Sequence, residues 1–138
     1  MPNTQATGVA YADPEFTICY ASQELGYSAA AQTAVTQATS KSTGVTANTS
    51  AGQITMNGAA LAGATAVSFI LTNSTINAKD TMIVSIASNT TGSAAGAYVC
   101  YVSYMVAGSA LITLRNLTAA TSYSEAVVIN FSIIHAAA

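Results

Sequence analysis

The sequence predicts an all-β fold, an antiparallel β-sandwich or jelly-roll-like single domain with an irregular N-terminal arm. Apolar and polar residues alternate along several short segments, which is typical of strands with one buried face. Turn-forming Gly, Asn and Ser separate these segments at roughly 8–15-residue spacing, with no strong helical period between them. No proline follows Pro14, so every residue of the predicted strands has the backbone N–H that pairing with a neighbouring strand requires.

The beginning of the chain has the weakest pattern. We therefore assign residues 1–34 to an N-terminal arm with a short strand, and residues 35–138 to the β-sandwich domain. Residues 16–21 fit the short strand. The alanine-rich residues 22–35 are ambiguous, because Gly26 weakens a helix assignment. The polar stretch that follows them fits loops and short strands.

Alternation becomes clear after Gly52 and predicts the strands of the main sheets. The larger apolar side chains fall on one face of each strand, as Val67, Phe69 and Leu71 do in one of them. We expect these faces to meet in the core. The predicted strands are residues 53–57, 66–72, 81–87, 98–106, 110–116 and 126–135.

Charged residues are unusually scarce. Asp, Glu, Lys and Arg make up 6% of the 138 residues, and the net charge is −2, whereas about 25% is usual for a soluble domain. A free monomer with so few charges is poorly protected against self-association, so we expect other chains to cover part of its surface. Three Lys and Arg residues are too few for the phosphate contacts that nucleic-acid binding requires.

We also expect no membrane partner. The apolar stretches are short and broken by Ser, Thr or Asn, well below the ~20 residues of a membrane-spanning helix. The first residues contain neither the basic nor the apolar region of a secretory signal, which disfavours export by that route.

The titratable residues do not form a recognisable catalytic pattern. His135 is the single histidine and lies three residues before Ala138, where we do not expect the rigid support that a Ser–His–carboxylate arrangement needs. Asp13 and Glu15 lie close together in the sequence, and we interpret them as a solvated turn, since the chain has no Trp for sugar stacking. We expect no enzymatic activity, no cofactor and no metal.

Cys19 and Cys100 are the two cysteines of the chain. One disulfide is possible, but spacing in the sequence does not bring two sulfur atoms together. We favour two small, buried and reduced side chains, because free cysteine is often buried.

Tyrosine and two isolated charges mark the candidate interface. Tyr98, Tyr101 and Tyr104 crowd one predicted strand, and strict alternation puts Tyr98 and Tyr104 on one face and Tyr101 on the other. Tyrosine is enriched at protein interfaces, although one of these faces is also expected to be core. Arg115 and Glu125 flank one loop. They form an ion pair across that loop or with a neighbouring chain, or they are exposed charges that contribute little. The candidate interface residues are Asp13, Glu15, Tyr98, Tyr101, Tyr104, Arg115 and Glu125.

About three quarters of the chain resembles a module of tailed-bacteriophage virion proteins. The resemblance rests on the order of residues 35–46, 52–57, 67–74, 95–98, 112–116 and 124–131. It implies a β-rich, often trimeric module, similar to capsid cement or decoration proteins and to modules that end tail fibres. The sequence departs from it in the additional residues 1–34 and in Tyr123, which interrupts the usual approach of small residues to Ser124 and Glu125.

Two functions follow from this resemblance. The first is a cement or decoration protein on the outer surface of the capsid, a homotrimer that stabilises the head through contacts with the major capsid protein. The alternative is a tail-fibre tip or receptor-binding module that recognises a host surface ligand. The resemblance transfers no catalytic residue to this chain.

Overall fold

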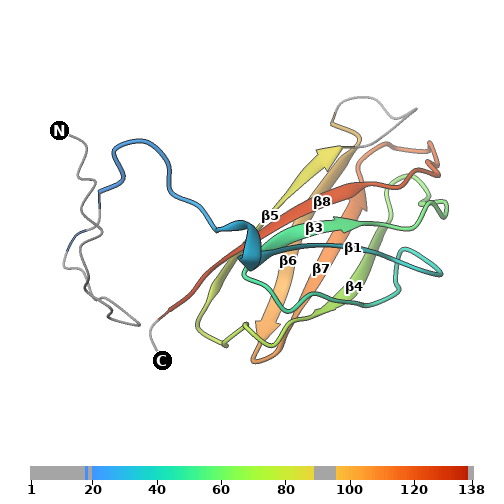
Figure 1. Ribbon diagram of the computed structural model, residues 1–138. Helices are drawn as coiled ribbons and strands as arrows, with labels where there is room; N and C mark the ends of the chain where they lie inside the picture. Colours follow the sequence, from blue (N-terminus) through green and yellow to red (C-terminus); the bar gives the residue numbers. More distant parts are fainter. Residues whose placement is uncertain (1–17, 19, 89–95, 137–138) are drawn as a thin grey trace.

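The computed structural model describes residues 18, 20–88 and 96–136. Two four-stranded sheets face each other, and a short 3₁₀ turn, Ala29–Ala31, precedes the first strand (Figure 1). The prediction of an all-β fold is confirmed. One sheet has the order β1 (Gln32–Thr36), β3 (Ala51–Thr55), β8 (Val128–Ile134), β5 (Thr81–Ser88), and the other has the order β2 (Val45–Thr46), β4 (Ala66–Thr72), β7 (Ser109–Asn116), β6 (Tyr98–Val106).

Both sheets are mixed, whereas the sequence predicts antiparallel ones. The pairs β3–β8, β5–β8, β4–β7 and β6–β7 are antiparallel, but β1 runs parallel to β3 and β2 runs parallel to β4. Alternation identifies the residues that share a face, but it does not fix the direction of a neighbouring strand. Strand β1 begins at Gln32, three residues before the expected domain boundary at Val35.

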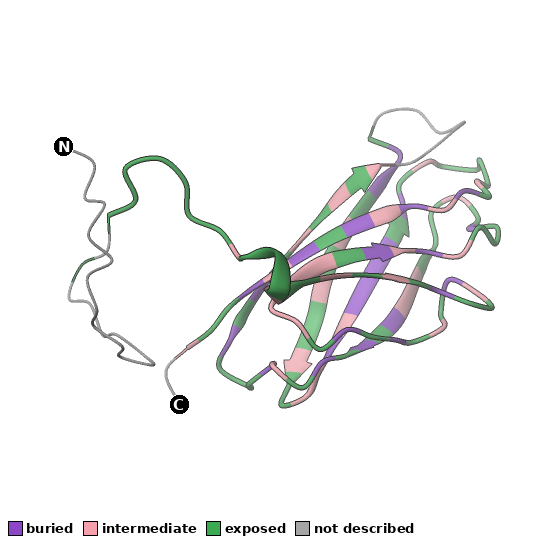
Figure 2. Ribbon diagram, viewed as in Figure 1, coloured by how far each residue is buried: buried purple, intermediate pink, exposed green. Residues whose placement is uncertain are grey.

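The core lies between the two sheets and is built by the predicted faces. Phe69 and Leu71 of β4 meet Ile129 and Ile133 of β8 in one hydrophobic cluster. Buried and exposed residues alternate along β4, β5 and β8, as Figure 2 shows. The alternation in the sequence therefore identified the correct inner faces of these strands.

Two asparagines, Asn73 and Asn116, end strands of the second sheet with their side chains fully buried. The Oδ1 atom of Asn73 accepts a hydrogen bond from the backbone N–H of Thr75 at 2.9 Å, and that of Asn116 accepts from Thr118 at 3.0 Å. Each Nδ2 group donates to a backbone carbonyl of a distant loop. These asparagines fix the loops because the buried backbone groups would otherwise lack partners.

Gly52 permits a close approach between β1, β3 and β8. A Cβ atom at this position would lie 2.5 Å from the backbone oxygen of Thr33 and 2.8 Å from the ring of Phe131. The Phe131 ring therefore packs against bare backbone, and any larger residue at position 52 would displace it or the neighbouring strand.

Candidate functional site

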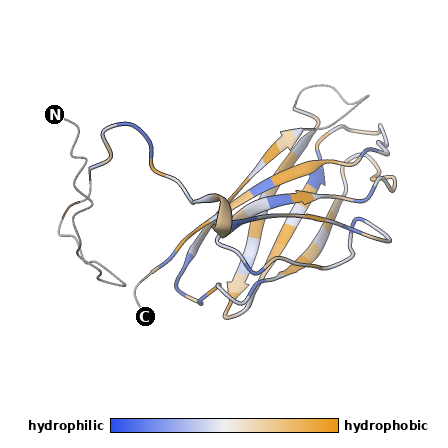
Figure 3. Ribbon diagram, viewed as in Figure 1, coloured by the Kyte–Doolittle hydropathy of each residue, from blue (hydrophilic) through white to orange (hydrophobic). Residues whose placement is uncertain are grey.

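The outer surface of the β2–β4–β7–β6 sheet exposes large apolar side chains. Tyr101 and Tyr104 of β6 are 44% and 51% exposed. The register places Tyr104 beside Leu111, and Leu111 beside Ile70, so an apolar row crosses three strands. Orange colour along these strands marks their apolar character (Figure 3). We call this surface the tyrosine face, and it consists of Ile70, Val99, Tyr101, Tyr104, Val106 and Leu111.

Polar groups in the middle of the tyrosine face are already paired with one another. Thr113 lies opposite Tyr101, and its hydroxyl forms hydrogen bonds with Ser68 Oγ at 2.8 Å and with Ser103 Oγ at 2.5 Å. Hydroxyls that bond each other lose less on contact with another apolar surface than hydroxyls that depend on water. The face is therefore suited to a largely dry protein contact.

A β-bulge in β6 places Tyr101 and Tyr104 on the same exposed face. The prediction that they lie on opposite faces is therefore wrong. The register of β6 against β7 shifts between Val102 and Tyr104. The extra residue, Ser103, places Tyr104 on the same face as Tyr101, and strict alternation therefore fails at this point. Tyr98 lies before the bulge with its side chain in the core, 7% exposed, so it is not available as an interface residue.

Arg115 and Glu125 occupy different environments. Arg115 is exposed at the end of β7, beside Val99 on the outer face, whereas Glu125 is 5% exposed. Within the described residues, the one contact between a carboxylate and a basic side chain joins Asp80 and His135. The hypothesis of an ion pair between Arg115 and Glu125 across their loop is therefore wrong. The alternative of two exposed charges is also wrong, because Glu125 is buried, whereas a pair with a neighbouring chain stays a prediction.

Glu125 instead belongs to a buried polar cluster that the sequence did not reveal. Lys41 is 3% exposed, and its Nζ atom donates hydrogen bonds to the backbone oxygens of Asn57 and Glu125, both at 2.6 Å. Gln37 supports this loop by donating to the backbone oxygens of Lys41 and Thr43 at 3.0 and 2.8 Å. The cluster joins the loop after β1 to the loop before β8. A single lysine in a polar stretch gives no signal of burial.

The electrostatics of this cluster follow from its burial. Burial lowers the pKa of Lys41, and the negative charge of Glu125 partly offsets this effect. Burial, followed by interaction with the Glu125 carboxyl, raises the pKa of the Tyr98 hydroxyl above its ordinary value of 10.0. The Tyr98 hydroxyl and both carboxylate oxygens of Glu125 form no hydrogen bond within the described part of the chain. Gln37, Lys41 and Glu125 are all buried, so this cluster offers no exposed side chain for a partner.

The described residues before β1 lie largely in solvent. Tyr20 and Leu25 are 87% and 88% exposed. Tyr27 attaches this segment to the first sheet, because its hydroxyl donates to the backbone oxygen of Ile133 and its own carbonyl accepts from Gln32 Nε2 at 2.8 Å. Figure 1 shows the segment extending away from the sandwich before it reaches β1.

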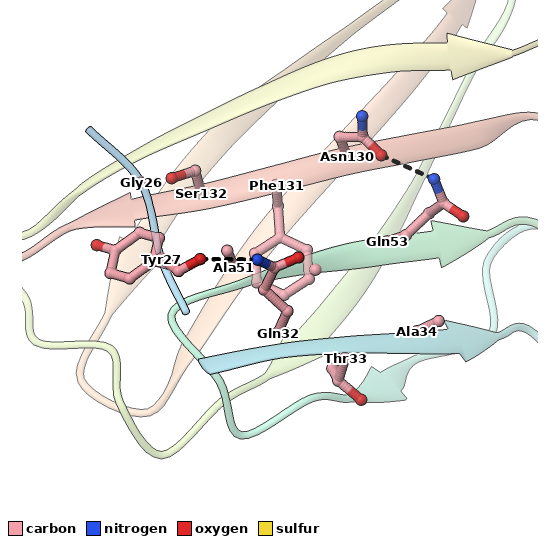
Figure 4. A pocket seen from close by; sticks show the side chains of 11 residues that line it. Gly26, Tyr27, Gln32, Thr33, Ala34, Ala51, Gln53, Asn130, Phe131 and Ser132 are labelled. Atoms are coloured by element: carbon pink, nitrogen blue, oxygen red, sulfur yellow. Dashed lines mark hydrogen bonds between the residues drawn. The ribbon is translucent and has the colours of Figure 1, made fainter. Parts of the chain in front are cut away.

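A shallow groove of about 600 Å³ follows Tyr27 across the outer surface of the first sheet (Figure 4). Amides dominate its polar surface, and Gln53 Nε2 donates to Asn130 Oδ1 at 3.0 Å. Gln32 and Ser132 add further neutral polar groups. The groove contains no charged side chain, so its ligand would be neutral and rich in hydrogen-bonding groups.

The remaining sequence candidates fall partly outside the described residues. Asp13, Glu15 and Cys19 lie there. Cys100 is a free, half-buried thiol in β6, and burial raises its pKa. Among the described residues, no group of three or more His, Cys, Asp and Glu side chains is placed to hold a metal ion.

The comparisons with known proteins assign the chain to no group. No family model, no curated protein and no solved structure matches it. The described residues include no helix that is both long and apolar enough to cross a membrane.

Proposed function

We propose that this chain is a structural protein of a tailed-bacteriophage virion, a capsid cement or decoration protein that stabilises the head through protein–protein contacts. The tyrosine face is the observation that carries the proposal. A row of exposed tyrosine and aliphatic side chains across three strands is the composition that distinguishes interface centres from ordinary surface. The resemblance of the sequence to phage virion modules supplies the location.

The scarcity of charged residues indicates that burial of apolar surface, rather than attraction between charges, would drive the proposed contacts. With 6% charged residues, electrostatic steering contributes little, so burial of apolar area must drive association. Each exposed tyrosine has roughly 100 Å² left to bury, which corresponds to about 2.5 kcal/mol at about 25 cal/mol per Å². Repetition of the contact on a particle would add avidity to each modest contact.

We assign the tyrosine face to contacts between copies of the chain, and the exposed segment before β1 to the major capsid protein. The tyrosine face contains no charged residue, and Arg115 lies beside it, opposite Val99, which suits a second copy of the same neutral surface. The choice of a homotrimer over a dimer rests on the resemblance. The role involves no catalytic step and places the protein on the outer surface of the capsid.

Mass measurement in solution tests the self-association. We expect a trimer at micromolar concentration, and we expect Tyr104→Lys to weaken it by roughly 30-fold, as removal of a buried tyrosine anchor does. Ser85→Lys is the control, because Ser85 is also exposed but lies on the outer surface of the other sheet. A wild-type monomer, or equal effects of both variants, would contradict the proposal.

The groove in Figure 4 favours one second candidate, a tail-fibre tip that binds a host glycan. Its amides and Tyr27 resemble the neutral hydrogen-bonding and stacking groups that recognise sugars. Titration with neutral oligosaccharides distinguishes the two roles, because Gln53→Ala and Asn130→Ala would abolish glycan binding and leave the trimer intact.

A further inference from the structure

A chain of hydrogen bonds joins a serine, a histidine and an aspartate at the C-terminal end of β8. Ser50 Oγ lies 2.9 Å from His135 Nε2, and His135 Nδ1 lies 2.9 Å from Asp80 Oδ2. These three residues come from the loops before β3 and β5 and from the end of β8. The expectation that His135 lacks support at the chain terminus is therefore wrong, because side chains hold both of its ring nitrogens.

Asp80 orients the imidazole of His135 through the contact between Oδ2 and Nδ1. Its side chain is fully buried. Oδ2 accepts a hydrogen bond from the backbone N–H of Asn77, and Oδ1 accepts one from Ala136, both at 2.9 Å. These two backbone N–H groups, followed by His135, hold the pKa of Asp80 below its ordinary value despite burial. The carboxylate therefore stays ionised near neutral pH.

An ionised Asp80 fixes the tautomer of the neutral imidazole. A carboxylate only accepts hydrogen bonds, so the proton of the neutral ring lies on Nδ1. The lone pair of Nε2 then faces the hydroxyl of Ser50, which must donate to it. This is the arrangement in which a histidine acts as general base toward a serine nucleophile.

The surroundings of His135 are apolar and open. The imidazole is 37% exposed and lies in the wall of a cavity of about 490 Å³. The other lining residues are Leu25, Gly26, Tyr27, Ile83, Ser132 and Ile134. Aliphatic side chains predominate, and no Asp, Glu, Lys or Arg side chain is among the lining residues. A small, uncharged and largely apolar group fits these walls beside His135, and Ser50 is linked to the cavity by its hydrogen bond to that imidazole rather than by lining it.

We propose that Ser50, His135 and Asp80 form a hydrolytic site for uncharged carboxylic esters with a short apolar acyl chain. Ser50 Oγ attacks the carbonyl carbon while its proton passes to His135 Nε2. The bond between the acyl carbon and the alcohol oxygen breaks, and the leaving oxygen takes that proton. Water, deprotonated by His135, then releases the acid and restores the Ser50 hydroxyl. Ser50 and His135 are the catalytic residues, and Asp80 is a positioning residue.

This activity goes beyond the proposed association role and does not depend on it. The hydrolytic site lies on the first sheet, whereas the tyrosine face is the outer surface of the second. It also departs from the expectation, drawn from the sequence, that the chain has no enzymatic activity.

The test combines a serine-directed fluorophosphonate probe with hydrolysis of p-nitrophenyl butyrate. Intact mass should show one probe per chain, and peptide mapping should place it on Ser50. Ser50→Ala should abolish labelling and lower kcat at least 100-fold, because it removes the nucleophile. Ser85→Ala, an exposed serine on β5, is the matched control and should change neither.

Asp80→Asn tests whether Asp80 positions the His135 imidazole, because Asp80 itself does not contact the substrate. An asparagine amide can donate to Nδ1 and hold the wrong tautomer, so kcat should fall while KM stays unchanged. Wild-type chain that is not labelled at Ser50 overturns the proposal, whatever the variants do. Retained hydrolysis in Ser50→Ala with loss in His135→Gln also overturns it, because the imidazole alone would then be the catalyst.

Discussion

Replacing Lys41 with methionine tests whether the buried polar cluster stabilises the sandwich. Met fills much of the space of the lysine stem, but the backbone oxygen of Asn57 loses its Lys41 donor, and that of Glu125 keeps only the N–H of Val127 at 3.1 Å. Each unsatisfied buried carbonyl costs about 1–3 kcal/mol, and the Glu125 carboxylate loses a nearby positive charge.

One effect acts in the opposite direction. The variant no longer buries an ammonium group, whose pKa is lowered by burial in the wild type. We expect a net loss of about 3 kcal/mol in the free energy of unfolding, because two hydrogen bonds from a charged donor are lost and each contributes about 1.5–3 kcal/mol. For a domain of this size, that corresponds to a decrease in Tm of about 10 °C.

Urea unfolding followed by circular dichroism measures the loss, with Lys79→Met as the control because Lys79 is exposed. The double variant Lys41→Met/Glu125→Gln should recover about 1 kcal/mol or more relative to the sum of the single variants, since no unbalanced charge remains. A loss below about 1 kcal/mol for Lys41→Met, or additivity in the double variant, would refute this account of the cluster.

Three further predictions concern other parts of the fold. Asn116→Ala should cost about 3 kcal/mol in unfolding free energy, because it removes four hydrogen bonds of a buried side chain, two to the backbone oxygens of Leu61 and Thr121 and two from the backbone N–H and hydroxyl of Thr118; an effect below that of an exposed Asn77→Ala control would contradict it. Gly52→Ala should lower stability by about 2 kcal/mol through overlap with the Phe131 ring, and an unchanged thermal melt would show that β1 moves freely. The lowered pKa of Asp80 contributes stability that is present above its ordinary value of 3.8 and is lost as the pH falls below that value. The decrease in Tm with acid should therefore be shallower in Asp80→Asn, and parallel pH profiles would rule this out.

Much of the sandwich followed from local alternation. The bounds of β4 and β6 agree with the predicted residues 66–72 and 98–106, because both strands carry large apolar side chains. Strand β1 was missed, since Ala34 and the threonines around it carry little apolar signal. Its parallel pairing with β3 depends on long-range contacts that alternation does not encode.

The candidate interface was only partly predictable for a similar reason. Tyr101 and Tyr104 are exposed as expected of interface residues, but their common face depends on a bulge that no residue type announces. The burial of Glu125 depends on Lys41, which is 84 residues away in the sequence. The same holds for His135, whose support by Asp80 and Ser50 comes from residues distant in the chain.

The thermal disruption of virus particles tests the proposed association with the capsid most directly. Particles that carry the protein would be compared with particles that lack it, and then with depleted particles to which the wild-type chain or Tyr104→Lys is added back. Our account predicts that depleted particles release their DNA at a lower temperature, that the wild-type chain restores the higher temperature, and that Tyr104→Lys does not. Equal robustness of depleted particles, with the protein located at the tail tip, would contradict it.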